Sequence, residues 1–104
     1  MATKAIAIID DEIDVTSLFK EALELNGFLV SAYSDSIQAY KILEKEIQKY
    51  GVILSDFRMP NLNGYELCTK LKQLNPELEV ILMSAYDTIE CDDTSKFTIV
   101  KSLF

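Results

Sequence analysis

Histidine and tryptophan are absent from this chain, and cysteine, glycine and proline are scarce. Its 104 residues include two Cys, three Gly and two Pro. Without an imidazole, the chain cannot form a Ser-His-Asp or Cys-His catalytic arrangement or a histidine-ligated metal site. With so little glycine and proline there is also no linker-like stretch. We therefore expect one domain over residues 1–104.

Long apolar runs are missing as well. No segment approaches the roughly 20 apolar residues of a membrane span. The apolar run at residues 5–9 is short and precedes three acids, which is unlike a signal peptide. Cys68 and Cys91 form no CxxC pair, and so few cysteines favour reduced thiols over a disulfide framework. These features predict a soluble cytoplasmic protein without a membrane partner.

Basic side chains are outnumbered by acidic ones. The chain has 10 Lys and Arg against 17 Asp and Glu, for a formal net charge of -7. A negative surface repels the nucleic-acid backbone, so we expect no nucleic-acid partner. Apolar residues make up 49% of the sequence, which is enough for a core and too much for a disordered chain.

What the chain does have is a regular alternation of short apolar runs and helical periodicity. We expect strands over residues 4–9, 28–33, 52–55, 79–84 and 97–101. A first helix follows Asp14 as N-cap and ends at Asn26-Gly27, with apolar Val15, Leu18, Phe19, Ala22 and Leu25. A second helix is capped by Ser34 or Asp35, and a third covers residues 64–74. This alternation predicts an α/β fold with a parallel sheet and helices on both faces.

Polar residues fall where the expected strands end. Asp10 and Asp11 follow the first strand and Asp56 the third, while Ser84 and Lys101 end the fourth and fifth. In open parallel sheets, ligands bind outside the carboxyl ends of the strands. Three carboxylates together repel and raise one another's pKa, which a hard divalent cation such as Mg²⁺ relieves. The sequence therefore predicts a magnesium site, with a hydroxyl and an ammonium placed to bind phosphoryl oxygens.

Several short motifs occur together and in order at these strand ends. They are Ile9-Asp10-Asp11-Glu12, the run Ser-Asp-Phe-Arg-Met-Pro-Asn-Leu-Asn-Gly at residues 55–64, Met83-Ser84-Ala85 and Val100-Lys101. Together they resemble the receiver domain of two-component response regulators over essentially the whole chain, and the resemblance weakens after Tyr86. The resemblance implies a flavodoxin-like, doubly wound, parallel five-stranded sheet with strand order 2-1-3-4-5. It also implies a signalling module and not an enzyme, with only self-phosphorylation and dephosphorylation chemistry.

The resemblance assigns roles at the predicted site. Asp56 is similar to the phosphoacceptor that takes a phosphoryl group from a sensor histidine kinase or a phosphotransfer protein. Asp11 and Asp56 would ligate Mg²⁺ directly, with the backbone carbonyl of Arg58 as a third ligand and Asp10 acting through water.

Two further roles follow from the resemblance. Ser84 is similar to the hydroxyl that moves toward the phosphoryl group, and Lys101 to the lysine that pairs with it. Taken alone, Ser84 is equally well explained as an ordinary hydroxyl at the end of a strand. The family motif also contains Met59-Pro60 and Gly64, which we interpret as turn and helix-start residues. Cys68 is interpreted as a packed helix residue.

The carboxyl-terminal third departs from the family pattern. Residues 85–96 show little apolar periodicity, so we expect the family's fourth helix to be reduced to a turn or absent. Ser102 stands where the family has a proline, and a trans bond is expected because a cis non-proline bond costs about 3 kcal/mol. Thr98 replaces the aromatic residue expected three positions before Lys101. The adjacent Phe97 is expected to point to the opposite face of the strand.

The fifth helix of the family is also missing, because the sequence stops at Phe104. In the family, the first and fifth helices together cover one face of the sheet. We therefore expect apolar side chains of the third, fourth and fifth strands to be uncovered, and a homodimer to form through that face. A truncated sequence is an equally good explanation of the short end.

Other functions have to be weighed against that of a phosphoacceptor. A degenerate receiver would act as an interaction or dimerisation module independent of phosphorylation. A haloacid dehalogenase-type phosphatase is disfavoured because it needs a second acid two residues after its nucleophile, whereas Asp10 and Asp11 are adjacent. A dinucleotide-binding fold is disfavoured because no glycine-rich loop follows the first strand. Asp10, Asp11 and Glu12 alone also suit a solvated acidic loop, but Asp56 after a buried strand favours a site.

Overall fold

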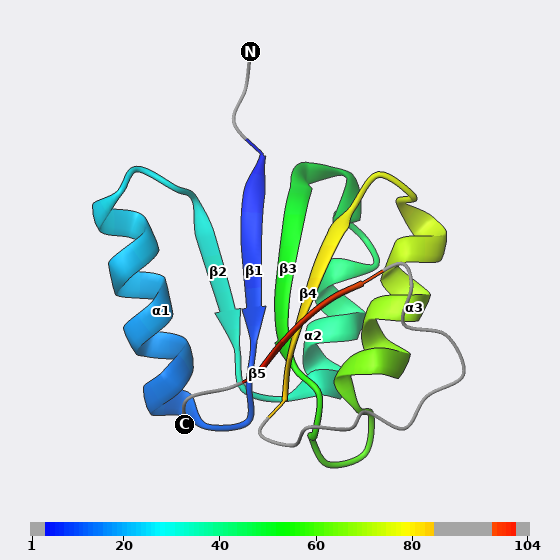
Figure 1. Cartoon of the computed structure of the whole chain (residues 1–104). Helices are drawn as coiled ribbons and strands as arrows, with labels where there is room; N and C mark the ends of the chain where they lie inside the picture. The colour runs from blue at the N-terminus through cyan, green and yellow to red at the C-terminus, as the bar shows by residue number, and fades with distance from the viewer. Residues whose placement is uncertain (1–3, 85–96, 102–104) are drawn as a thin grey trace.

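Five parallel strands form one sheet, shown in the computed structural model of Figure 1, which describes residues 4–84 and 97–101. The strands are β1 (Ala5–Ile9), β2 (Val30–Tyr33), β3 (Tyr50–Asp56), β4 (Glu79–Ser84) and β5 (Thr98–Lys101). Their order is β2-β1-β3-β4-β5, and every neighbouring pair is parallel. The predicted flavodoxin-like sheet is therefore confirmed.

The helices connect successive strands as crossovers. They are α1 (Ile13–Leu25), α2 (Ser36–Leu43) and α3 (Gly64–Leu74), with a short 3₁₀ turn, η1 (Ile47–Lys49), before β3. The segment of the predicted reduced fourth helix, residues 85–96, and the last three residues lie outside the described part of the chain.

The sheet has one tightly packed face, which is covered by α2 and α3 (Figure 1). Alternate strand residues point into this layer because side chains in a strand alternate between faces. Its core contains Ala7, Ile9, Ala39, Leu43, Ile47, Tyr50, Ile53, Phe57, Met59, Leu62, Leu67, Cys68, Leu71, Leu78, Val80 and Leu82. Cys68 is fully buried here, which confirms it as a packed helix residue.

The opposite face is covered less completely. α1 contacts β2 and β1, and Ile6 and Ile8 of β1 and Val15 of α1 are buried on this side. On this side, Leu54 of β3 and Ile81 of β4 are only half-buried. Their sequence neighbours Ile53 and Leu82, which point to the α2–α3 layer, are both 0% exposed. In the described part of the fold, the α2–α3 face is thus closed over Ile53 and Leu82, whereas the α1 face is partly open over Leu54 and Ile81.

The start of α1 differs from the prediction. Glu12 is the N-cap residue, and Asp14 lies in the first turn. The carboxylate of Asp10 accepts a hydrogen bond from the Glu12 N–H at 2.9 Å. The Glu12 carbonyl accepts from the Val15 N–H at 3.1 Å. Because Asp10 turns the chain sharply after β1, the helix begins before Asp14, and the predicted Asp14 cap was wrong.

The predicted stop of α1 at Asn26-Gly27 is confirmed. Gly27 has a positive φ of 89°, and its N–H donates to the Glu24 carbonyl at 3.0 Å. The Phe28 N–H donates to the Leu23 carbonyl at 3.2 Å. This pair of bonds is a Schellman closure, which favours glycine at the left-handed position. Since Phe28 takes part in it, β2 begins at Val30 and not at residue 28.

Side-chain caps fix the starts of the other two helices. The Asp35 carboxylate accepts from the Ile37 N–H at 2.9 Å, so Asp35 and not Ser34 caps α2. The Asn63 side chain accepts from the Glu66 N–H at 2.8 Å at the start of α3. Gly64 is the first residue of α3, as its interpretation as a helix-start residue requires. Within residues 4–84 and 97–101, no helix is both long and apolar enough to cross a membrane.

Candidate metal site at the carboxyl end of the sheet

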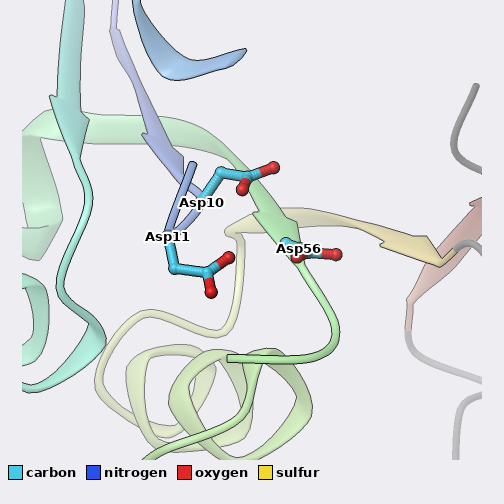
Figure 2. Close-up of side chains that lie close together, drawn as sticks. All are labelled: Asp10, Asp11 and Asp56. Atoms are coloured by element: carbon cyan, nitrogen blue, oxygen red, sulfur yellow. The ribbon is translucent and has the colours of Figure 1, made fainter. Parts of the chain in front are cut away.

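Three aspartates meet where two neighbouring strands end. Asp10 directly follows β1, Asp11 comes next, and Asp56 is the last residue of β3, which pairs with β1. One carboxylate oxygen from each lies within 4.8 Å of the others, and Figure 2 shows the three side chains gathered at this edge. Asp10 is buried, Asp56 is half-buried and Asp11 is exposed. The structure therefore brings the three predicted acids together.

Burial and mutual repulsion both act on these carboxylates. The pKa of Asp56 is raised to about 6, first by burial and then by the charges of Asp10 and Asp11. Hydrogen bonds from the Phe57 and Arg58 N–H groups lower that pKa by less. The pKa of Asp10 is also raised, chiefly by burial. Burial and the neighbouring acids thus both disfavour the ionised form of Asp10 and Asp56.

This donor set suits a hard divalent cation. Carboxylate oxygens are the ligands that Mg²⁺ and Ca²⁺ prefer, and a bound cation lowers the pKa of neighbouring carboxyl groups. One buried, one half-buried and one exposed carboxylate leave the cluster open to solvent on the side of Asp11. The residues present therefore fit such an ion.

The chain after Asp56 forms a tight loop before α3. The Phe57 N–H donates to the Met83 carbonyl at 2.8 Å, and the Phe57 carbonyl accepts from the Gly64 N–H at 2.8 Å. Asn61 has a positive φ of 72°, which asparagine tolerates better than most residues. These bonds hold both ends of the loop that contains Arg58, whose carbonyl was predicted as a ligand.

Two hydroxyls that the sequence did not single out also hold this loop. The Ser36 Oγ donates to the Pro60 carbonyl at 3.2 Å, and the Ser55 Oγ donates to the Asp56 carbonyl at 3.0 Å. Both serines are buried. Only weak indications of these roles are present in the sequence, because Ser55 merely precedes an acid at a strand end and Ser36 merely stands at a helix start.

The remaining predicted site residues lie at the ends of β4 and β5. Ser84 pairs with Lys101 in the β4–β5 register, and Met83 pairs with Asp56. Ser84 is 2% exposed. The structure thus brings the backbones of Ser84 and Lys101 to the same edge as the acids, while the Lys101 side chain lies outside the described part of the chain.

An aromatic pair links β5 to α3. The Phe97 ring, next to Thr98, meets Tyr65 edge to face, with ring centroids 5.7 Å apart and an interplanar angle of 68°. Tyr65 is the second residue of α3. Phe97 therefore packs toward the α2–α3 layer, and Thr98, which stands at the family's aromatic position, is exposed.

Comparisons with known proteins agree with this arrangement. The sequence model of the response regulator receiver domain matches residues 6–97. The chain is 33% identical over 88 residues to the C4-dicarboxylate transport transcriptional regulatory protein DctD of Rhizobium meliloti. It is 27% identical over 96 residues to the sporulation initiation phosphotransferase F of Bacillus subtilis. These matches cover 85% and 92% of the chain, but 19% of the first relative and 76% of the second.

One solved structure is similar to this chain in both fold and sequence. It is a response regulator protein from Burkholderia pseudomallei with a phosphorylated aspartic acid, a calcium ion and citrate. Its TM-score is 0.74 at 25% identity, covering 84% of this chain and 50% of that one. With the family match over most of its length and the three aspartates at the expected strand ends, the chain belongs to the response regulator receiver domain family.

Proposed function

We propose that this chain is a Mg²⁺-dependent phosphoacceptor in which Asp56 receives a phosphoryl group from a sensor histidine kinase or a phosphotransfer protein. The observation that carries the proposal is the meeting of Asp10, Asp11 and Asp56 at one edge of the sheet of a receiver domain. The family match over residues 6–97 supports treating residues 1–104 as one receiver domain. We place its action in the cytoplasm, where kinases have access to ATP.

The acidic cluster would hold the metal. We assign Asp11 and Asp56 as direct ligands, the Arg58 carbonyl as a third, and Asp10 as a ligand through water. When bound, Mg²⁺ offsets the charge of the carboxylates and of the incoming phosphoryl oxygens. The raised pKa values of Asp10 and Asp56, caused first by burial and then by the neighbouring acids, support this assignment, because a cation would favour the ionised carboxylates.

The chemistry of Asp56 is an in-line displacement. One of its carboxylate oxygens attacks the phosphorus of the donor phosphohistidine, and the phosphorus–nitrogen bond breaks. The electron pair stays on the donor nitrogen, and an acyl phosphate forms on Asp56. We assign the Ser84 hydroxyl and the Lys101 ammonium to the oxygens of the bound phosphoryl group. The chain would thus be a signalling module, with no substrate to turn over.

The direct test is covalent modification. Wild-type protein with Mg²⁺ and a small acyl phosphate donor should gain one phosphate adduct by intact mass, and Asp56→Asn should gain none. Asp14→Asn removes an exposed acid from α1 and is the matched control, which should be modified like the wild type. Absence of any adduct on the wild type, or an adduct on Asp56→Asn, would contradict the proposal.

A second candidate function is supported by the partly open face of the sheet. On the α1 side, Leu54 and Ile81 are half-buried and Val100 is 45% exposed. Such an apolar strip suits a protein partner, and we propose a second copy of this chain as that partner. Sedimentation should show a dimer that Leu54→Glu disrupts, whereas Ile37→Glu, on exposed α2 surface, should leave it intact. A monomer at tens of micromolar would count against this role.

A further inference from the structure

Ser55 occupies a fully enclosed position directly before Asp56. Its side chain is 0% exposed, and its Oγ donates a hydrogen bond to the Asp56 carbonyl at 3.0 Å. The pairing of β3 with β1 ends at the Ile9–Ser55 pair. The hydroxyl therefore supplies a donor to the Asp56 peptide at the point where the sheet ladder with β1 stops.

The start of α3 presses on the same peptide. A Cβ atom at Gly64 would overlap the Asp56 carbonyl oxygen and lie 2.9 Å from the Ser55 Oγ. The Gly64 N–H also donates to the Phe57 carbonyl at 2.8 Å. The peptides on either side of Phe57 are thus fixed by α3 and by a side chain beneath it.

A second buried group completes this contact. Cys68, one turn into α3, is 0% exposed, and a hydrogen bond with Ser55 lowers the pKa of its thiol, although burial raises it more. Cys68 and the Asp56 carbonyl therefore lie against the same Ser55 side chain, which joins α3 to the peptide of the proposed phosphoacceptor.

We propose that Ser55 is a positioning residue for Asp56. By fixing the Asp56 peptide plane, its hydroxyl sets the direction of the Asp56 carboxylate and of the chain that leads to the Arg58 carbonyl. A ligand that is already held in place does not have to be ordered when the metal binds. This inference rests on the proposed function of Asp56, and it adds a residue that touches neither metal nor phosphoryl group.

The test compares substitutions at two buried residues, only one of which removes the hydrogen bond to the Asp56 carbonyl. Ser55→Ala frees the Asp56 carbonyl, whereas Cys68→Ala removes packing and one thiol but leaves the Ser55–Asp56 bond intact. Mg²⁺ affinity is measured by titration, following the Phe57 and Arg58 amide resonances. We expect Ser55→Ala to weaken Mg²⁺ binding about tenfold, as loss of a partner that orients a ligand does. Cys68→Ala should bind like the wild type although its melting temperature falls.

Two further readouts separate positioning from stability. The Asp56 carbonyl carbon resonance should shift in Ser55→Ala and stay in place in Cys68→Ala, because only the first loses the hydrogen bond. The rate of acyl phosphate modification at low Mg²⁺ should fall in Ser55→Ala and recover most of its value at saturating Mg²⁺. Ser55→Cys, which keeps a weaker donor of similar size, should be modified at a rate between those of the wild type and Ser55→Ala.

The outcomes distinguish this inference from the proposed function. Wild-type protein that binds Mg²⁺ and is modified, together with an unchanged Ser55→Ala, would overturn the role of Ser55 alone. Equal loss of Mg²⁺ affinity in Ser55→Ala and Cys68→Ala would also overturn it, since packing would then explain both. If the wild type neither binds Mg²⁺ nor accepts a phosphoryl group, the proposed function fails and the role of Ser55 fails with it.

Discussion

Replacing Asp56 by asparagine should stabilise the metal-free protein at neutral pH. The pKa of Asp56 is raised to about 6 in the folded chain, against an ordinary value of 3.8. The folded state therefore holds this proton more tightly than the unfolded state, and the carboxyl group favours folding only while it is protonated. That contribution is complete below about pH 4 and is lost as the pH rises through about 6. The amide side chain of the Asp56→Asn variant carries no charge at any of these pH values.

The size of the effect follows from the shift. About two pKa units at about 1.36 kcal/mol each correspond to about 3 kcal/mol. Because Asp56 is only half-buried, water screens part of this, and about 1–2 kcal/mol is the expected gain at pH 7.5. For a domain of about 100 residues, that gain raises the melting temperature by roughly 5–10 °C.

Thermal unfolding with a chelator present measures this difference. The gap between Asp56→Asn and wild type should be largest at pH 7.5 and narrower at pH 5. Added Mg²⁺ should raise the melting temperature of the wild type and leave that of the variant unchanged, because a ligand stabilises only a folded protein that binds it. Asp14→Asn removes the same charge from an exposed position and should change stability by less than about 0.5 kcal/mol. A variant that melts no higher than wild type at pH 7.5, or a difference in melting temperature that grows toward pH 5, would show that the Asp56 charge does not destabilise the fold.

Two further substitutions test the supports of the site. Gly64→Ala places a methyl group against the Asp56 carbonyl, so we expect a loss of about 1–3 kcal/mol or more from overpacking, measured by urea unfolding; wild-type stability would contradict the close contact. Asp35→Ala removes the α2 cap that binds the Ile37 and Gln38 N–H groups, and it should cost about 1 kcal/mol in the same assay. Ser34→Ala is its control, and an equal loss there would contradict the assignment of the cap.

Much of the fold could be predicted because the periodicity of the apolar residues and the residues that favour turns indicated the same elements along the chain. The third helix and the fourth strand were predicted with the bounds that the structure shows, residues 64–74 and 79–84. Gly64 is the first residue of the helix, and a turn at residues 76–77 separates the helix from the strand. Two of the boundaries that shifted lie where a hydrogen bond overrides propensity, whereas the third strand, predicted over 52–55, runs from Tyr50 to Asp56. Asp10 moved the start of α1, and the Schellman closure at Phe28 delayed β2.

The apolar pattern of α1 was a weaker guide to packing. Val15 is buried, but Leu18 and Leu25 are 53% and 80% exposed. Periodicity shows that a helix has an apolar stripe, and it does not show how wide a surface the sheet offers to it. Since α1 contacts β2 and β1, part of its stripe lies beyond the contact.

The acidic cluster was predictable for a topological reason, and its supports were not. Asp10, Asp11 and Asp56 follow strands that a parallel sheet places side by side, so their meeting follows from the strand order. The hydroxyls of Ser36 and Ser55 act through carbonyls of the loop, and such contacts depend on the path of the backbone. No pattern of residue types in the sequence specifies that path.

The unequal covering of the two sheet faces has a consequence for the dynamics of the molecule. α1 buries only Val15 and Thr16 of its 13 residues, whereas α3 buries Gly64, Leu67, Cys68 and Leu71. A helix with few buried contacts opens locally at a lower free energy than the rest of the fold. Amide hydrogens of α1 should therefore exchange with solvent well before those of α3. The helix that leads away from the acidic cluster would then detach and return while the sheet and its α2–α3 layer stay closed.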